Sequence, residues 1–387
     1  MMIHAVTSAL PGATKSLRKP GIAADPAFIT SVMSLIMLGW LMVFSASLSV
    51  TDAAAGSTYQ FTLRHSIHVL MGLSLMFVVS RVRSGILMRI SPVLLVTGII
   101  LLILVLLPGI GAKVNGSVRW LNLGLMRVQP SEFMKLFMII YVAGYVVRKK
   151  EDLGLFVPGI VIMSMVLGLV GTLLLLEPDL GTVVVLSITV MTMLYLAGVR
   201  FLHFMIVVLT GAGSMALLTW LSPYRMERVT GFLDPWADPF DSGFQLVQAL
   251  IAFGRGEWFG VGLGASIQKL AYLPAAHTDF LLAVLAEELG FSGILFVIGL
   301  FVVLVFRGFH IARLAEQRGD LYSTRLVQGM SLLLGWQAAI NMGVNMGMLP
   351  TKGLTLPLMS YGGSSMIVSC LAVGMILMVD RENRIAS

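Results

Sequence analysis

The chain has 387 residues, of which 57% are hydrophobic and only 12% are charged, and its mean hydropathy is +0.93. Ordinary soluble domains are about one quarter charged, so this composition excludes a soluble globular protein and predicts an integral membrane protein. The formal net charge of +7 then indicates cytoplasmic anchoring of helices rather than a nucleic-acid-binding surface. A single cysteine, Cys370, excludes an internal disulfide framework.

Ten apolar segments are predicted to span the membrane as helices. The first is predicted to be an anchor, because it is too long for a signal peptide and no small-residue cleavage site follows it. The fourth and tenth are short, so we expect their helices to begin earlier in the chain. In chain order the segments are 28–50, 63–82, 90–107, 133–147, 155–176, 180–199, 201–221, 280–306, 326–348 and 366–379.

The distribution of Lys and Arg predicts the orientation of these helices. With the N-terminus inside and an even number of crossings, most of the 26 basic residues fall on the cytoplasmic side. The predicted fold class is therefore an all-α polytopic membrane protein with about ten transmembrane helices and both termini in the cytoplasm. It forms one transmembrane domain, 27–380, between the cytoplasmic tails 1–26 and 381–387.

The remaining basic residues concentrate in three outer segments, which are 113–135, 225–269 and the surroundings of Lys352. The first mixes Gly, Asn and Pro with apolar residues and is predicted to dip back into the membrane interface. The second belongs to a long periplasmic loop, 222–279, between helices 7 and 8, and its residues 244–253 are predicted to form an amphipathic surface helix. The third is tolerated at membrane depth only where it lines a protein cavity. Together they predict a site that faces outward.

The stretch AAHTDFLLAVLAEELG places Asp279 before the eighth helix and Glu287 and Glu288 within it. On a helix Glu287 lies roughly 12 Å deeper than Asp279, whereas paired glycosidase carboxylates lie roughly 5–10 Å apart. Asp279 is therefore a lone carboxylate, which either caps the helix or performs chemistry, and the two roles are compatible. We expect Glu287 and Glu288 to pair with an internal Arg, Lys or polar neighbour and to hold the helix.

Other charged residues have local explanations. Asp179 in EPDLGT is predicted to be the N-cap of the sixth helix, with a site role as an open alternative. Glu132 and Lys135 stand at i,i+3 and are expected to pair. Arg127 has no such local partner, which favours an anion site. No cluster of Cys, His and Asp has the spacing of a structural metal site.

One carboxylate surrounded by cations suits a particular reaction. A sugar activated by pyrophosphate leaves readily once Arg, Lys or a metal neutralises the charge, so only a base for the attacking hydroxyl is then required. The same set of residues also suits a protein that only binds a lipid carrying such a sugar pyrophosphate.

Five motifs of the chain resemble those of the SEDS proteins of bacterial cell-wall synthesis. They are NGSVRWLNLG, RVQPSEFMKL, EPDLGT, HTDFLLAVLAEELG and LPTKGLTLPLMSYGGSS. The resemblance runs from the first helix to the last, and the last motif is similar to the division branch rather than the elongation branch. It implies a ten-helix peptidoglycan glycosyltransferase of the bacterial inner membrane that polymerises lipid II at the division septum.

The resemblance also implies site residues. Asp279 is the essential acidic residue, and Arg127, Lys135 and Lys352 match the family's basic positions. We add Arg119, His277 and Ser360 to the predicted substrate-binding set, and predict structural or secondary roles for Glu177, Asp179, Glu287 and Glu288. No cofactor is predicted with certainty, and Mg²⁺ or Mn²⁺ are the candidates.

The implied partners are lipid II, the growing glycan strand, membrane lipid and other division proteins, with no nucleic acid. A class B penicillin-binding protein, an FtsI-like transpeptidase, is expected to pack its single transmembrane helix beside helices eight and nine. Two alternatives within this setting are an elongation-type polymerase and a transporter that flips lipid II across the membrane. A scaffold that only recruits partners has no use for a lone Asp beside cations.

Overall fold

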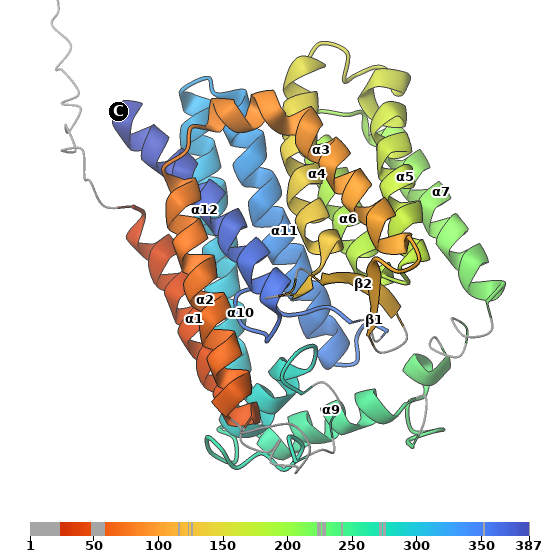
Figure 1. Ribbon diagram of the computed structural model, residues 1–387, viewed down its shortest axis with the longest axis vertical. Helices are drawn as coiled ribbons and strands as arrows, with labels where there is room; N and C mark the ends of the chain where they lie inside the picture. The colour runs from red at the N-terminus through yellow and green to blue at the C-terminus, as the bar shows by residue number, and fades with distance from the viewer. Residues whose placement is uncertain are drawn as a thin grey trace, which may run out of the picture.

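The computed structural model describes residues 24–386 except 48–58, 115–116, 123, 125–126, 223–225, 227–229, 241–242, 271–272, 274–275 and 351–352. Most of this chain is helical (Figure 1). The helices are α1 Pro26–Ser47, α2 Tyr59–Ser80, α3 Ser84–Leu106, α4 Pro130–Arg148, α5 Ile162–Leu176 preceded by the π-helical turn η1 Val157–Val161, α6 Leu180–Leu196, α7 Phe201–Trp220, α9 Phe244–Gly256, α10 Leu281–Gln317, α11 Leu321–Asn345 and α12 Gly363–Ala386.

Each of the ten predicted apolar segments coincides with a helix. The earlier starts expected for the fourth and tenth are confirmed, because α4 begins at Pro130 and α12 at Gly363. Seven helices in the described part of the chain are long and apolar enough to cross a membrane, namely α1, α2, α3, α4, η1 with α5, α10 and α12. The helix α6 and residues 201–214 of α7 are shorter apolar helices. The polytopic helical prediction is therefore confirmed, and ten crossings stay a prediction.

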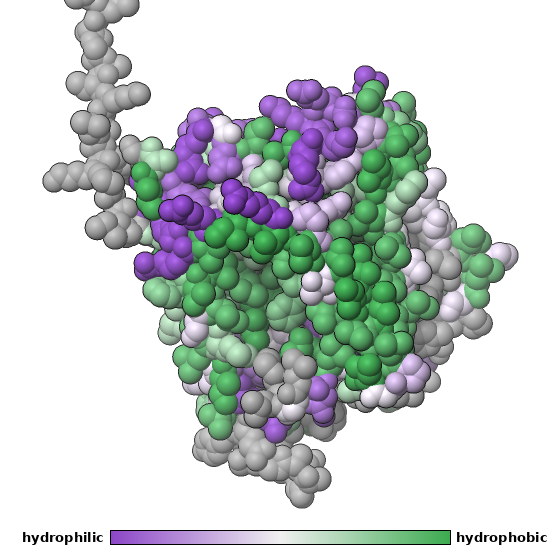
Figure 2. All heavy atoms as spheres, turned by 45° about the horizontal axis from the view of Figure 1, so that its top comes forward, coloured by the Kyte–Doolittle hydropathy of each residue, from purple (hydrophilic) through white to green (hydrophobic). Residues whose placement is uncertain are grey.

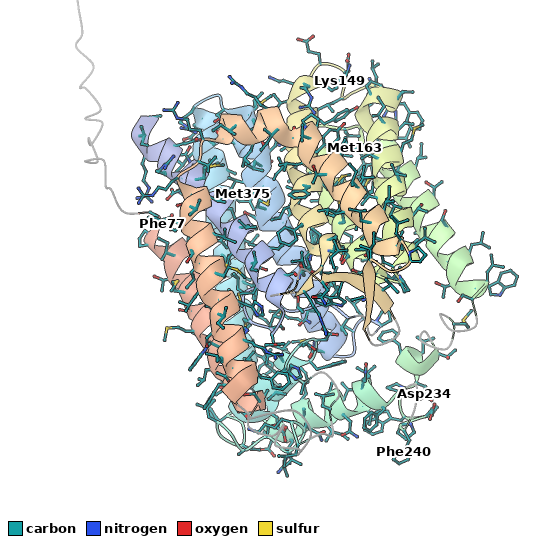
Figure 3. All side chains as sticks on the ribbon, in the orientation of Figure 1. Phe77, Lys149, Met163, Asp234, Phe240 and Met375 are labelled. Carbon is teal, nitrogen blue, oxygen red and sulfur yellow. The ribbon has the colours of Figure 1, made fainter. Side chains whose placement is uncertain are left out.

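The two ends of the described chain lie at the same end of the helix bundle. The backbone N–H of Asp25, before α1, donates to the carboxylate of Asp380 in α12 at 3.0 Å, and Arg307 of α10 forms an ion pair with Asp25. Hydrophilic side chains gather at this end above a band of hydrophobic ones (Figure 2). Lys149 also lies at this end, whereas Asp234 and Phe240 lie at the opposite one (Figure 3). We name them the inner and outer ends, after the predicted orientation.

Helices α4, α11 and α12 are buried along most of their length. In their most apolar windows 78% of α4 and 83% of α12 is buried, against 17% of α2 and 28% of α3. Glycines bring α12 and the segment before it close to their neighbours, because a Cβ on Gly374 would meet the backbone of Met76, and one on Gly39 would meet the backbone of Met359. Helices α2 and α3, at the periphery of the bundle, instead direct large apolar side chains away from the protein, as lipid-facing helices do.

The segment after α3 differs from the prediction. It forms a three-stranded antiparallel sheet in the order β1 Gly111–Val114, β2 Ser117–Asn122 and β3 Arg127–Val128. The all-α prediction is therefore wrong for this segment. An Asn-Gly pair at 115–116 between β1 and β2 is a strong hairpin signal, which the prediction did not use.

Helix α10 is broken at Gly290, which has φ of 68° and ψ of −165°. The eighth predicted segment, 280–306, is therefore helical on both sides of a break. The break frees the carbonyls of Glu287 and Glu288, which accept from Val261 and Gly262, and the N–H groups of Phe291 and Ser292, which donate to Glu257 and Trp258. A Cβ on Gly290 would lie 2.4 Å from the backbone nitrogen of Gly260, so only glycine allows this close approach. Residues 257–262 of the outer loop thereby form hydrogen bonds with the backbone groups on either side of the break.

The break divides α10 into two parts with different surroundings. Every residue of 281–288 is buried within the protein. The part after Gly290 exposes large apolar side chains such as Leu295, Phe296 and Phe306. That second part is long enough to cross the roughly 30 Å hydrocarbon core alone. The first part is therefore an internal helix that carries Asp279 at its start.

Candidate functional site

Asp279 lies in the turn that enters α10 and is held by its backbone. Its carbonyl accepts hydrogen bonds from the side-chain amides of Asn341 and Asn345 of α11, both at 3.0 Å. The N-cap residue of α10 is Phe280, and no side chain caps the helix from that position. The alternative in which Asp279 caps its own helix is therefore not realised.

The Asp279 carboxyl group faces the segment between α11 and α12. A Cβ placed on Gly353 would lie 3.3 Å from Oδ2 of Asp279, so the absence of a side chain at Gly353 leaves room beside the carboxylate. Burial raises the pKa of Asp279 to about 6, the charge of Arg119 acts to lower it, and Asp179 acts to raise it. A carboxylate with a pKa near the working pH is suited to general base catalysis.

Arg119 of β2 connects the sheet to the α5–α6 turn. Its Nε donates to the backbone carbonyl of Glu177 at 2.9 Å, and its Nη2 donates to that of Pro178. The hairpin that the all-α prediction missed is therefore what carries this cation towards Asp279. The side chain remains partly exposed, so it can still face an anion.

The α5–α6 turn contains two acidic residues with different roles. Asp179 is the N-cap of α6, as predicted, and accepts from the backbone N–H of Thr182 at 3.3 Å, its hydroxyl at 2.9 Å and the hydroxyl of Ser131 at 3.0 Å. Glu177 is fully buried, and within the described residues neither of its carboxyl oxygens has a hydrogen-bond partner. Burial, helped by Asp179, raises the pKa of Glu177 to about 8, so this group is mostly protonated at neutral pH.

Replacing Asp179 by alanine is expected to destabilise the protein by about 2 kcal/mol, because the α6 N-terminus loses its cap and Ser131 loses an acceptor. Thermal unfolding in detergent would measure this as a lower Tm. Asp152→Ala is a matched control, since its pair with Lys149 is about half exposed on both sides and contributes little. Equal Tm values for the two variants would contradict the capping role.

Lys135 is fully buried rather than presented to the outer surface. Its Nζ donates to Glu132 at 2.9 Å, as the i,i+3 spacing predicted, and to Oε1 of Gln337 at 2.7 Å. Gln337 in turn donates to the carbonyl of Thr355 at 3.1 Å. In this conformation Lys135 therefore supports the segment beside Asp279, and its place in the substrate-binding set stays a prediction.

The other predicted substrate-binding residues have different surroundings. Arg127 is exposed on β3, and Lys352 lies outside the described residues, next to Gly353. The backbone carbonyl of His277 accepts from the N–H of Tyr361 at 2.9 Å, and its ring packs edge-on against that of Tyr361. Ser360 is buried, and its hydroxyl accepts from the N–H of Leu356 at 2.9 Å. Ser360 therefore shapes this segment from within.

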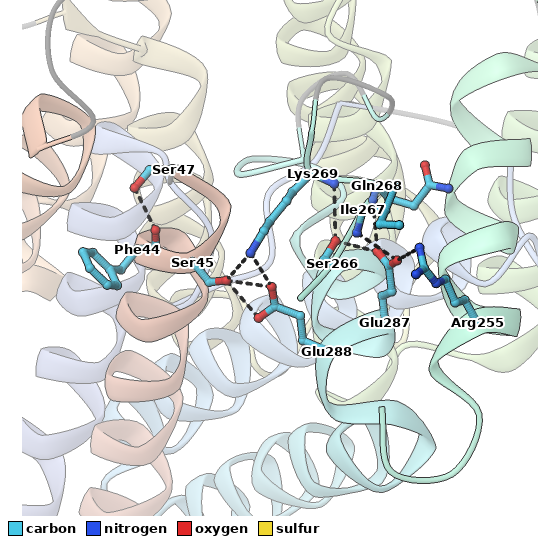
Figure 4. Close-up of polar contacts among 10 residues, drawn as sticks. All are labelled: Phe44, Ser45, Ser47, Arg255, Ser266, Ile267, Gln268, Lys269, Glu287 and Glu288. Atoms are coloured by element: carbon cyan, nitrogen blue, oxygen red, sulfur yellow. Dashed lines mark hydrogen bonds and ion pairs between the residues drawn. The ribbon is translucent and has the colours of Figure 1, made fainter. Parts of the chain in front are cut away.

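Glu287 and Glu288 are buried and paired, as the sequence predicted (Figure 4). Glu287 accepts from Arg255 at 3.3 Å, and from the hydroxyl of Ser266 and the N–H groups of residues 267 and 268. Glu288 accepts from Lys269 at 2.8 Å and from the hydroxyl of Ser45 in α1. We name these contacts the loop clasp, because they fasten the outer loop to the internal part of α10.

Three residues of α11 that the sequence analysis did not single out belong to this site. Gln337, Asn341 and Asn345 are buried, and their four-residue spacing places them on one face of the helix. Polar residues repeated at this spacing in an apolar helix were the signal that could have identified them. In the described part of the chain no three His, Cys, Asp or Glu side chains converge to hold a metal ion, so no residues are assigned to Mg²⁺ or Mn²⁺.

Comparison with known proteins gives consistent results. The cell cycle protein family of FtsW, RodA and SpoVE matches residues 26–385. A probable peptidoglycan glycosyltransferase FtsW of Nitrosococcus halophilus is 54% identical over 360 residues, which cover 93% of each chain. Among solved structures, a chain of a peptidoglycan synthase complex that coordinates polymerization and crosslinking has a TM-score of 0.78 at 29% identity, covering 94% of this chain and 99% of that one. The rod shape determining protein RodA of Thermus thermophilus has a TM-score of 0.67 at 27% identity, covering 93% and 98%.

Proposed function

Because this chain belongs to the cell cycle protein family of FtsW, RodA and SpoVE, we propose that it is a peptidoglycan glycosyltransferase of the bacterial inner membrane. It polymerises lipid II into glycan strands at the outer face of that membrane during septal wall synthesis. The division role follows the identity to proteins named FtsW, which is 54% over nearly the whole chain, against 27% for RodA. The observation that supports the activity is that the carboxylate of Asp279 does not cap its own helix.

In the proposed reaction Asp279 accepts the proton of the 4-hydroxyl of the acceptor lipid II. The hydroxyl oxygen forms a bond to the anomeric carbon at the end of the growing strand, whose configuration inverts. The bond from that carbon to the pyrophosphate oxygen breaks, and undecaprenyl pyrophosphate leaves with the electron pair. Arg119, Arg127 and Lys352 neutralise the charge that develops on the leaving group.

The experiment that tests this function is polymerisation of labelled lipid II by the purified chain together with its partner. Glycan strands that lengthen with time are expected. A liposome assay for lipid II flipping separates the transporter alternative, since a polymerase moves no lipid II across sealed vesicles. Flipping without strand synthesis would refute the proposal.

The pH dependence of this reaction follows from the raised pKa of Asp279. The deprotonated form is the active one, so the rate is expected to be level above pH about 7 and to fall about tenfold per unit well below pH 6. Strand synthesis measured from pH 5 to 8 would show this fall in rate, which is the acidic limb of the pH profile. A level profile down to pH 5 would contradict the assignment of the base.

We also propose a class B penicillin-binding protein as the partner, with its transmembrane helix beside α10 and α11. The similarity to a synthase complex that joins polymerization to crosslinking supports this choice. Apolar side chains exposed along these helices offer the contact, such as Val302 and Val303 of α10 and Trp336 of α11.

A further inference from the structure

The buried amide face of α11 contacts both segments that surround the Asp279 carboxyl group. This face consists of Gln337, Asn341 and Asn345. Asn341 donates to the carbonyls of Asp279 and Leu354, and Asn345 donates to that of Asp279. The amides therefore join the turn before α10 to the segment after α11.

Asn345 also caps α10 from outside. Its Oδ1 accepts from the N–H of Ala283, in the first turn of the helix, at 3.2 Å. Its Nδ2 donates to Asp279 and, at 2.9 Å, to the carbonyl of Asn341. These contacts fix the orientation of the amide, because Ala283 requires an acceptor where the two carbonyls require a donor.

We propose that Asn341 and Asn345 are positioning residues for the transfer reaction, because they keep the Asp279 carboxylate directed at the Gly353 segment instead of at the N-terminus of its own helix. This inference rests on the proposed role of Asp279 as the base. An aspartate at the start of a helix can turn back to accept from the first N–H groups. Here a neighbouring helix supplies that acceptor, so the carboxylate remains available for the substrate.

Removing the amide of Asn345 is expected to move the Asp279 carboxylate in one direction, towards the start of α10. The N–H of Ala283 loses one of its two acceptors and keeps the carbonyl of Phe280 at 3.0 Å. The carbonyl of Asp279 keeps the amide of Asn341. The position that Oδ1 of Asn345 leaves at the start of α10 is then open to another acceptor, and we expect the Asp279 carboxylate to turn towards it. A carboxylate that caps a helix has a lower pKa and is a weaker base, and it is turned away from the acceptor hydroxyl.

Within the described residues, the charged groups that act on Asp279 are Arg119 of β2 and Asp179 at the start of α6. Neither is altered by a change in α11. A shift of the acidic limb in Asn345→Ala, which adds no charge, therefore reports the position of Asp279.

The test compares Asn341→Ala, Asn345→Ala and Asn345→Asp in the full chain with its partner, with lipid II as substrate. Asn345→Ala is expected to lower kcat at least tenfold, leave KM within about threefold and move the acidic limb to lower pH. Asn341→Ala keeps the acceptor for Ala283, so it is expected to lower kcat with a similar KM and to leave the limb in place. Asn345→Asp keeps an acceptor for Ala283 but adds a negative charge, so its limb is expected to move to higher pH. A purely structural role predicts an unshifted limb for Asn345→Ala.

Asn383→Ala provides the matched control, because this buried amide also donates to a helix carbonyl, that of Ile311, but lies in the C-terminal part of α12. It is expected to leave kcat and the limb within twofold of wild type. If the Asn341 and Asn345 variants lose rate only in proportion to their folded fraction, and the limb of Asn345→Ala is unchanged, the positioning role is overturned. If Asp279→Asn itself retains full activity, the proposed function fails instead. Should Asn345→Ala not fold, Asn341→Ala decides alone, since it keeps the cap.

Discussion

Asp279→Asn is expected to abolish synthesis of glycan strands while the protein still folds and binds its partner. Asparagine preserves the size of the side chain but cannot accept the proton of the attacking hydroxyl. The loss of a general base costs about 10²- to 10⁴-fold in rate. The backbone carbonyl of Asp279, which the two asparagines of α11 bind, is unaffected by the change. The measurement is the initial rate with labelled lipid II.

The comparison needs a carboxylate whose loss should not matter for the chemistry. Asp152→Asn serves this purpose, because Asp152 pairs with Lys149 near the inner end, far from the site. It is expected to polymerise at the wild-type rate. If Asp279→Asn retained the wild-type rate with an unchanged Tm, another group would have to be the base.

The positions of the helices could be predicted because hydropathy depends directly on the solvent around each segment. All ten apolar segments are helical, and the pairing of Glu287 and Glu288 followed from the cost of isolated charge among apolar residues. Such predictions need only the local sequence and the identity of the solvent. Asp179 as an N-cap is of the same kind.

The rest of the site depends on contacts between distant segments. Local patterns mark the hairpin and the polar face of α11, but they do not say which segment each one contacts. Arg119 binds carbonyls 58 and 59 residues away, and Asn341 reaches Asp279 from 62 residues away. The break at Gly290 exists only because the outer loop supplies partners for the freed backbone groups. Glycine in an apolar helix is common enough that the sequence alone does not mark this break.

The internal part of α10 is held at both ends by polar contacts. The amide face of α11 holds its start, and the loop clasp holds its end. Because Asp279 lies at the start of this short helix, a displacement at the clasp is transmitted to the carboxylate through one rigid element. The stability of the clasp therefore bears on activity as well as on folding.

Glu288→Ala is expected to destabilise the protein by about 3–5 kcal/mol, because it leaves the Lys269 ammonium buried without its carboxylate. The side chain of Lys269 is only 4% exposed and that of Glu288 is fully buried. Arg255→Gln at the neighbouring pair is the matched control, with an expected cost of about 0–1 kcal/mol. The Arg255 side chain is 40% exposed, and Glu287 keeps Ser266 and two backbone donors without it.

Unfolding of the two variants in the same detergent, followed by Tm, would compare these costs. Replacing both Glu288 and Lys269 by methionine should recover much of the loss, since the cost comes from a buried ammonium group that has lost its carboxylate rather than from lost packing. A double variant as unstable as Glu288→Ala would instead place the cost in the hydrogen bonds from Ser45 to Glu288. Strand synthesis by the double variant then distinguishes two roles of the clasp. A normal rate means that the clasp only stabilises the fold. A low rate in a stable protein means that the ion pair also sets the position of the helix that carries Asp279.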